Sequence, residues 1–319
     1  MTKLIIKKAF YLLLMLFLIS LISFFMIHLA PNSFFSAGVL NPNMTPESIE
    51  HLKRVYGLDK PLVIQYVLWL KSITLLDFGI SFASGLSVID EIKSRLAITL
   101  GMNIAAMVAI FWLALWLGVK SALGSETTSK RIKQLSLLSY STPSFYLALL
   151  FILFLAYKFE LFPIGGLNDF EVEAGTLSWY IDRVYHLTLP VSVMIFVGFG
   201  SLTLYIRSLT IDILKSDYIY FAKSRGFDND AIRKRYIYPN LLPFIITILG
   251  LSLPGLLGGS VILEQIFGID GMGLLFYQSA LSRDYPVIMG ILIIGAFLTL
   301  LGNIIADLLL YKLNPNFKK

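Results

Sequence analysis

Long apolar runs alternate with short polar segments along this chain. A bilayer core of about 30 Å is crossed by about 20 apolar residues in a helix, and six runs reach that length. They are Ala9–Leu29, Leu96–Val119, Gln134–Tyr157, Leu187–Ile206, Leu241–Leu263 and Val287–Leu310. The pattern predicts an all-α, polytopic membrane protein with six transmembrane helices.

Composition and charge support this prediction. Hydrophobic residues make up 57% of the chain and charged residues 14%, with a mean hydropathy of +0.78, whereas soluble domains carry about 25% charged residues. The net charge of +6 comes from basic residues between apolar runs, as in loops that set membrane topology. We therefore expect no nucleic-acid partner. The absence of cysteine excludes disulfides and thiolate metal sites.

The N-terminus combines three lysines with the first apolar run, as a signal peptide does. The run Ala9–Leu29 is 21 residues long, and the apolar part of a signal peptide is about 7–15 residues long. We therefore interpret it as a retained first helix.

The distribution of basic residues predicts the orientation. Most of the 26 Lys and Arg residues fall in segments that share one side with the N-terminus, and the loop Phe159–His186 on the other side is mainly acidic. Because basic loops stay in the cytoplasm, both termini are expected there. The expected parts are a cytoplasmic N-terminus with the first helix (1–30), an extracytoplasmic helical segment (31–95), a five-helix core (96–311) and a cytoplasmic tail (312–319).

The extracytoplasmic segment has signals for two short helices. Thr45 and Pro46 are typical of a helix start, and Gly57 is placed to end that helix. Val63–Leu76 predicts a second helix that lies at the membrane interface. Residues Lys120–Lys133 predict a short polar loop between the second and third spans.

The polar segment Asp212–Asn240 has the most informative pattern. Residues Tyr218–Arg225 predict a helix that ends at Gly226 in the left-handed conformation. Asp228 predicts the N-cap of a second helix, and Pro239 with Pro243 predicts the return to the membrane. A solvated basic loop explains the charges of this segment. It explains neither the glycine and proline spacing nor its aromatic residues, which are Tyr218, Tyr220, Phe221, Phe227, Tyr236 and Tyr238.

Signals for catalysis, metal binding and ion relay are absent from the sequence. No phosphate-binding glycine loop occurs, and the histidines His28, His51 and His186 are scattered without a partner four residues away. The charged residues Arg207, Glu264 and Asp307 fall near span ends, where side chains reach the interface. A proton- or sodium-coupled carrier usually needs charge near the midplane, so the energy for transport is expected to come from another protein. Glycines 255, 258 and 259 with Ser260 indicate close helix packing.

Several motifs together resemble one family. Tyr220-Phe221-Ala222-x-x-x-Gly226, followed by Pro239, is similar to the cytoplasmic EAA loop of ABC importer permeases, with Tyr220 and Phe221 in place of Glu and the first Ala. Further segments resemble the B-type permeases of the dipeptide/oligopeptide/nickel branch over nearly the whole length. Among them are Tyr56–Pro61, Asp77–Ser81, His186–Pro190, Glu264–Gly273, Arg283–Pro286 and Asp307–Pro315.

The resemblance implies a type I ABC importer transmembrane fold (MetI-like) in a bacterial cytoplasmic (inner) membrane. It implies as partners a homologous C-type permease, two ATP-hydrolysing subunits and an extracytoplasmic solute-binding protein. ATP and Mg would be bound by the ATPases, and this chain would hold no cofactor or metal and catalyse nothing. Segment 212–240, hereafter the coupling loop, would seat in a groove of the ATPase. Its expected contact residues are Tyr218, Tyr220, Phe221, Ala222, Arg225, Gly226, Phe227 and Pro239.

The solute and the transport class have alternatives. Di- and oligopeptides lead, followed by nickel, metal chelates and other small solutes, and residues of the substrate path are not identified. A stand-alone secondary carrier and a non-transporting scaffold are alternatives from other classes. For the importer, Gly226→Asp is expected to abolish uptake because a bulky charge jams the turn.

Overall fold

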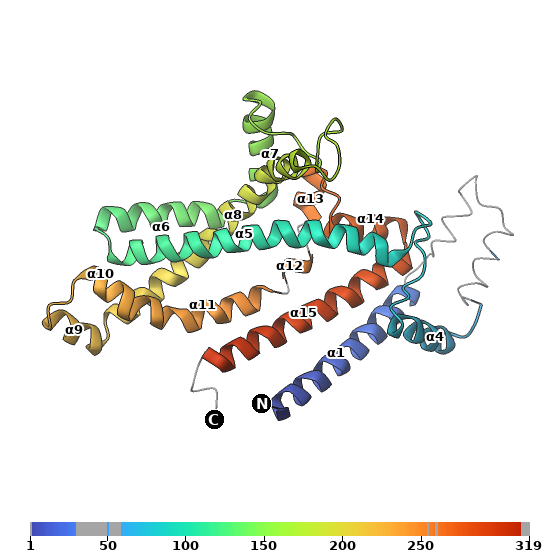
Figure 1. Ribbon diagram of the computed structural model, residues 1–319, viewed down its shortest axis with the longest axis horizontal. Coiled ribbons are helices and arrows are strands. Elements are labelled where there is room, and N and C mark those ends of the chain that lie inside the picture. The colour runs from blue at the N-terminus through green and yellow to red at the C-terminus, as the bar shows by residue number, and fades with distance from the viewer. Residues whose placement is uncertain (1, 30–49, 51–58, 254, 259–260, 314–319) are drawn as a thin grey trace. The chain divides into compact units, whose positions relative to one another are not determined.

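The computed structural model describes all residues except 1, 30–49, 51–58, 254, 259–260 and 314–319, and those described form a helical protein (Figure 1). The chain divides into two compact units. Unit 1 comprises Met1–Ile98 and Gly271–Ile304, and unit 2 comprises Thr99–Asp270 and Ile305–Lys319. The expected helix from Thr45 to Gly57 lies, apart from Glu50, outside the described residues.

Unit 1 contains α1 (Thr2–Leu29), α4 (Leu62–Thr74), α14 (Met272–Ser282) and most of α15 (Tyr285–Leu313). The helix predicted over Val63–Leu76 is therefore confirmed as α4. Tyr66 of α4 packs against Phe24 of α1 with ring centroids 5.3 Å apart. The carboxylate of Asp284 accepts hydrogen bonds from the backbone N–H groups of Phe82 and Ala83, which fixes that segment at the start of α15.

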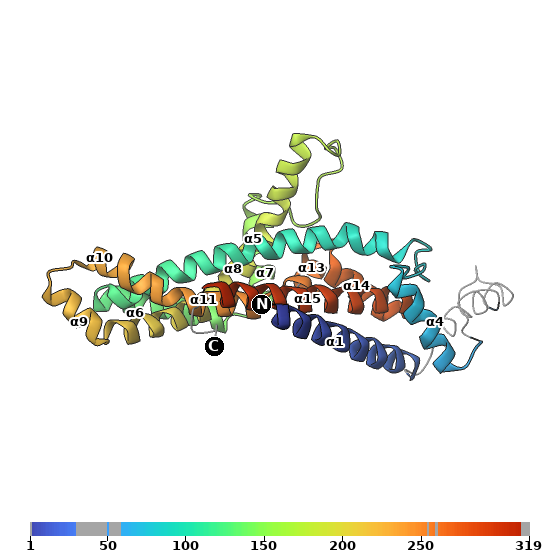
Figure 2. The same cartoon turned by 60° about the horizontal axis from the view of Figure 1, so that its bottom comes forward.

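Unit 2 contains α5 (Val88–Leu123) from Thr99 onward and the helices from α6 to α13. These are α6 (Glu126–Ser141), α7 (Ser144–Phe151), the π-helix η1 (Ile152–Lys158), α8 (Leu177–Leu214), α9 (Asp217–Ser224), α10 (Asn229–Ile232), the π-helix η2 (Arg233–Ile237), α11 (Tyr238–Ser252), α12 (Gly255–Gly258) and α13 (Val261–Phe267). Helices α6 and α8 pack closely, because Gly200 leaves room for the Ser136 carbonyl. Figure 2 shows α9 and α10 beyond the ends of α6 and α8, at one end of this unit.

The all-α fold is confirmed, but the described residues do not reproduce the expected count of six spans. Four helices are long and apolar enough to cross a membrane, namely Ile6–Met26, Val88–Leu123, Leu177–Leu214 and Tyr285–Ile305. The run Gln134–Tyr157 falls in two helices, α6 and α7–η1, that meet at 98° and together are long and apolar enough to form a fifth, broken span. Pro143 causes this break, because it cannot donate a helical N–H bond and it holds Thr142 in an extended conformation. In the run Leu241–Leu263, the described residues form α11, α12 and the start of α13, and residues 254 and 259–260 between them lie outside the described residues.

Two predicted loops are shorter than expected because the helices continue into them. The polar loop predicted at Lys120–Lys133 is reduced to Gly124 and Ser125, since the Ser125 hydroxyl caps α6 by accepting the Thr128 N–H at 3.3 Å. The helix that contains the predicted span Leu187–Ile206 begins at Leu177 and runs through Pro190. The loop predicted as Phe159–His186 therefore ends ten residues earlier.

Candidate functional site

The first half of the coupling loop contains helix α9, which has a C-terminal glycine cap. The Phe227 N–H donates to the Ala222 carbonyl at 3.2 Å, and the Gly226 N–H donates to the Lys223 carbonyl at 2.9 Å. This pair of bonds is a Schellman motif, which requires a left-handed residue at the position of Gly226. Gly226 has a φ of +83°, so the predicted glycine end is confirmed.

The second half begins at the predicted cap and continues into the membrane helix. The Asp228 carboxylate accepts the Ala231 N–H at 2.8 Å, which confirms Asp228 as the N-cap of α10. Pro239 and Pro243, which the sequence places at the return to the membrane, lie within a helical run, because α10, η2 and α11 follow one another without a loop. Pro239 is the second residue of α11 and follows η2 directly, and it cannot donate the backbone N–H that other residues of a continuous helix donate.

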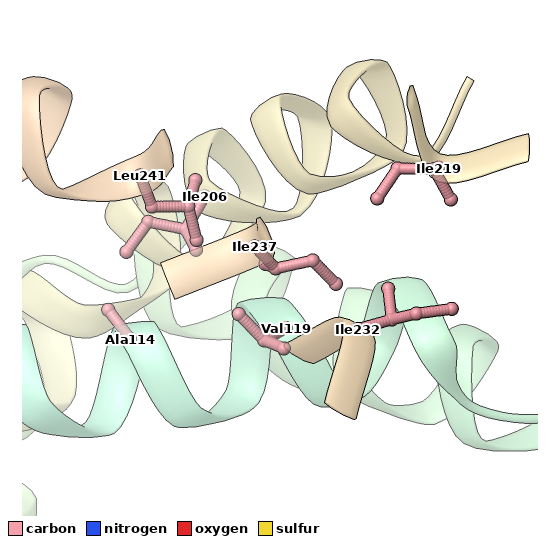
Figure 3. Packing of buried hydrophobic residues seen from close by; sticks show 7 residues of the cluster. All are labelled: Ala114, Val119, Ile206, Ile219, Ile232, Ile237 and Leu241. Carbon is pink, nitrogen blue, oxygen red and sulfur yellow. The ribbon is translucent and has the colours of Figure 1, made fainter. Parts of the chain in front are cut away.

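An apolar cluster fixes the coupling loop to the helices of unit 2. Figure 3 shows Ile219, Ile232 and Ile237 of the loop together with side chains of α5, α8 and α11. The three isoleucines are at most 1% exposed, and burying one such side chain stabilises a protein by about 1.5–3 kcal/mol. The cluster therefore holds the loop to α5 and α8 as one packed body.

The same helix α9 presents a different set of side chains to the outside. Tyr220 is 70% exposed and Phe221 is 63% exposed, with ring centroids 6.0 Å apart. Ala222 is only 2% exposed. Among the expected contact residues, Tyr220 and Phe221 are thus the most exposed aromatic side chains, and Tyr218 is 42% exposed, whereas Ala222 belongs to the loop's own core. Arg225, Gly226 and Pro239 are exposed as well.

Three other aromatic residues of the coupling loop, Tyr218, Phe227 and Tyr236, pack against one another. Tyr218 stacks on Tyr236 with centroids 6.1 Å apart, and Phe227 meets Tyr236 edge-on at 6.3 Å. The Arg235 guanidinium lies 5.3 Å from the Phe227 ring centre, within the range of a cation–π contact. These ring contacts hold the two halves of the coupling loop together.

The charges of the loop are mainly basic and exposed. The Lys234 ammonium lies 2.8 Å from the Asp230 carboxylate, and this hydrogen bond together with nearby Arg233 lowers the pKa of Asp230 below its usual value. Further exposed basic residues are Lys215, Lys223, Arg225 and Arg235. Exposed basic and aromatic side chains side by side suit a partner surface with an apolar groove and an acidic rim.

The sequence matches two known families that together cover nearly its whole length. Residues 110–319 match the family described as binding-protein-dependent transport system inner membrane component, and residues 1–103 match the N-terminal family of the same membrane components. The chain is a member of this transporter family. The resemblance to importer permeases is thus confirmed.

Individual members of the family are similar to this chain from end to end. The oligopeptide transport system permease protein AppB of Bacillus subtilis is 34% identical, with 94% of each chain covered. The dipeptide transport system permease protein DppB of Lactococcus lactis is 34% identical and OppB of Haemophilus influenzae, an oligopeptide permease, is 32% identical, each with 100% of both chains covered.

Unit 2 of this family member also contains an apolar groove of about 540 Å³. It lies between α5, α8 and α11, and its lining includes Met107, Phe111 and Met194 with the polar side chains of Ser201 and Tyr205. Ligand sites are usually apolar hollows with a few polar groups. No sequence signal marks the groove, because its lining comes from helices far apart in the chain.

Two sequence predictions about polar residues in this family member are wrong. Glu264, expected at the interface, is 0% exposed and accepts a hydrogen bond from the Thr99 hydroxyl at 3.0 Å. It is buried because α13 is a short segment packed on other helices. His186, expected without a partner four residues away, has the carboxylate of Asp182 at 3.5 Å. The spacing Asp182-x-x-x-His186 is the sequence signal for this contact, because residues four apart lie on the same face of a helix.

Proposed function

We propose that this chain is the permease subunit of an ABC importer for di- and oligopeptides, forming half of the translocation pathway. The observation that carries the proposal is the coupling loop. Its buried side is packed on α5 and α8, and its outer side exposes Tyr220 and Phe221. The relatives named for peptide transport favour peptides over nickel or metal chelates.

The packing of the loop suggests how it transmits motion. A segment whose isoleucines are buried among the side chains of α5, α8 and α11 moves with those helices instead of bending separately. An ATPase that holds Tyr220 and Phe221 would then move the helices as a rigid body and alternate access to the two sides. The partner biases this switch only if it binds the two states with different affinity.

The proposal requires partners that supply energy and specificity. These are a C-type permease, two ATPase subunits that bind ATP and Mg, and an extracytoplasmic solute-binding protein. Both termini and the coupling loop lie on the cytoplasmic side of the inner membrane, in line with the basic residues Lys3, Lys7 and Lys8 and those of the loop.

The groove between α5, α8 and α11 is a suitable place for the peptide. Its apolar lining accepts different side chains, because dispersion contacts and apolar burial do not require a fixed geometry. Ser201 and Tyr205 supply polar atoms for a peptide backbone.

Reconstitution in liposomes tests the coupling loop. The importer complex is assembled with wild-type permease, with Tyr220→Ala plus Phe221→Ala, or with the control Tyr180→Ala, whose ring is 56% exposed on α8 outside the loop. Uptake of a labelled dipeptide and ATP hydrolysis are measured together.

The double variant should lose at least about tenfold in uptake, since two interface aromatics contribute more than about 1.4 kcal/mol to binding, and the control should match wild type. Equal uptake by all three would contradict the role of the loop, and uptake by the permease chain alone would favour a secondary carrier.

A second experiment tests the groove. Ser201→Trp fills it, whereas Ser208→Trp places the same ring on an exposed position of α8 outside the lining. Ser201→Trp should reduce uptake of longer peptides more than that of dipeptides. If the two variants behave alike, the groove is not part of the peptide path.

A further inference from the structure

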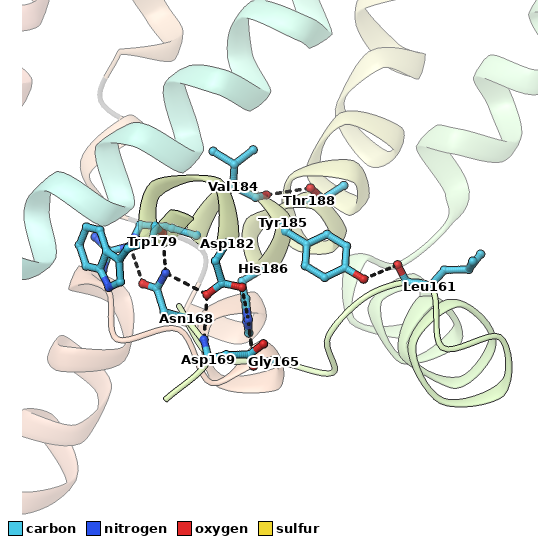
Figure 4. Close-up of polar contacts among 11 residues, drawn as sticks. Leu161, Gly165, Asn168, Asp169, Trp179, Asp182, Val184, Tyr185, His186 and Thr188 are labelled. Atoms are coloured by element: carbon cyan, nitrogen blue, oxygen red, sulfur yellow. Dashed lines mark hydrogen bonds and ion pairs between the residues drawn. The ribbon is translucent and has the colours of Figure 1, made fainter. Parts of the chain in front are cut away.

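Three side chains with metal-ligand atoms meet where the loop after η1 joins α8. The imidazole nitrogen Nε2 of His186 lies 3.5 Å from one carboxylate oxygen of Asp169 and 3.5 Å from one of Asp182. The ligand atoms of the three residues all lie within 4.8 Å of one another. Figure 4 shows the two carboxylates gathered about the imidazole.

The imidazole is buried, and Nε2 has no hydrogen-bond partner. The His186 side chain is 3% exposed, and its Nε2 is a buried polar atom without a hydrogen bond. The distance of 3.5 Å to each carboxylate exceeds the usual 2.7–3.2 Å of a hydrogen bond. A buried polar atom left unpaired costs about 1–3 kcal/mol, so a positive species between the three groups would stabilise the arrangement.

The other ring nitrogen determines which tautomer fits the site. Nδ1 lies 3.1 Å from the Gly165 carbonyl oxygen, which can only accept a hydrogen bond. Nδ1 therefore carries the proton, and in the neutral ring Nε2 directs its lone pair at the carboxylates. Metal-binding histidines almost always donate their second ring N–H to a carbonyl or carboxylate in this way.

The surroundings hold the ligands in place. The outer oxygen of Asp182 accepts hydrogen bonds from the Asp169 N–H at 2.8 Å and from the Asn168 side chain at 3.1 Å, so its inner oxygen stays directed at His186. The Gly165 carbonyl is fixed because its residue lies directly against the Phe267 carbonyl, where a Cβ would collide. The Gly166 N–H donates to that same carbonyl at 2.8 Å.

We propose that His186, Asp169 and Asp182 form a binding site for a divalent transition-metal ion, with Zn²⁺ as the best fit. Ligand atoms lie about 2.0–2.2 Å from Zn²⁺ and are tetrahedrally arranged, so two ligands are about 3.4 Å apart, close to the separations at His186. An imidazole ligand disfavours Mg²⁺ and Ca²⁺, which select oxygen ligands. Asp169 is 71% exposed, which leaves room for water as a fourth ligand. The ion ties the loop before α8 to the first turns of that helix.

Zinc binding to the purified full-length importer complex tests the site. Metal-free complex competes with a chromogenic chelator for Zn²⁺, as wild type, as His186→Gln, as Asp182→Asn and as the control Glu171→Gln, an exposed acidic residue of the same loop. Wild type and control should bind one Zn²⁺ per chain at this site. Because even outer partners of metal ligands change affinity by about 10–100-fold, His186→Gln should weaken binding at least about 100-fold and Asp182→Asn at least about tenfold.

A measurement on the wild-type complex keeps the proposal testable if a variant fails to fold. X-ray absorption at the zinc edge should find one imidazole nitrogen and otherwise oxygen ligands, since the site offers one imidazole and two carboxylates. The proposal is overturned if zinc is not retained, if its ligands are oxygen alone, or if a folded His186→Gln variant binds as wild type does. It is also overturned if nitrogen NMR finds both ring nitrogens of His186 protonated with zinc present, because a proton then occupies the place of the metal.

Discussion

Replacing Ile237 by alanine should separate the coupling loop from the helices that carry it. The Ile237 side chain is 0% exposed and packs in the cluster with Val119 and Ile206. A buried Ile→Ala change costs about 2–5 kcal/mol, and Ile→Val costs about 0.5–1.5 kcal/mol. Since each 1.4 kcal/mol is a factor of ten, a loss of about 3 kcal/mol raises the population of the detached loop about 100-fold.

Hydrogen exchange and transport assays together measure this effect. In Ile237→Ala, amides of α9 and α10 should exchange about 100-fold faster, while amides of α7 exchange as in wild type. Peptide uptake should fall although the partner ATPases still hydrolyse ATP, because the loop no longer moves the helices. Ile237→Val should give a smaller change in the same direction.

The matched control is Ile181→Ala on α8, where the side chain is 62% exposed. An exposed substitution usually changes stability by less than about 0.5 kcal/mol, so exchange in the loop should stay at the wild-type rate. The reasoning is refuted if Ile237→Ala and Ile181→Ala affect loop exchange equally, or if Ile237→Ala leaves both exchange and uptake unchanged.

Three further predictions concern local geometry. Gly226 has open space around its Cβ position, so Gly226→Ala should lower loop stability by about 1–2 kcal/mol through backbone strain alone. Gly226→Asn should lower loop stability by less. If the Asn variant keeps a stable loop but loses uptake, a partner approaches this position closely. Asp228→Ala should cost about 0.5–2 kcal/mol of loop stability, whereas Asp228→Asn keeps the cap; equal exchange rates in the two variants would contradict this. Gly200→Ala should lower the thermal midpoint, because its Cβ collides with the Ser136 carbonyl and overpacking costs about 1–3 kcal/mol. The same change at Gly101, where nothing lies nearby, should raise the midpoint, since alanine is the better helix former, and a fall at both positions would refute the packing argument.

Signals confined to a few neighbouring residues could be predicted from the sequence. The glycine end at Gly226 and the cap at Asp228 depend on backbone preference and on a side chain that reaches three residues ahead. The length of the apolar runs likewise identified an all-α membrane protein, because the bilayer sets that length. The motifs of the coupling loop led to the correct transporter family.

Other features became visible only in the tertiary structure, because packing decides them. Ala222 belongs to the loop's own core and Tyr220 does not, although both lie in the same short helix, since the position of α5 and α8 determines which face is covered. Glu264 is buried for the same reason. The continuous run α10–η2–α11 also became visible only in the structure, because neither Pro239 nor Pro243 ends a helix there.

Sequence by itself determined the class of protein, the approximate extent of its apolar runs and the turn chemistry of the coupling loop, all of which follow from composition and local backbone preference. Tertiary structure decided which side of α9 faces outward and where the helices bend. It also brought His186 against Asp169, seventeen residues earlier in the chain, and against the Gly165 carbonyl. Such contacts depend on how a loop folds back over a helix, and no local pattern of residues determines that loop conformation.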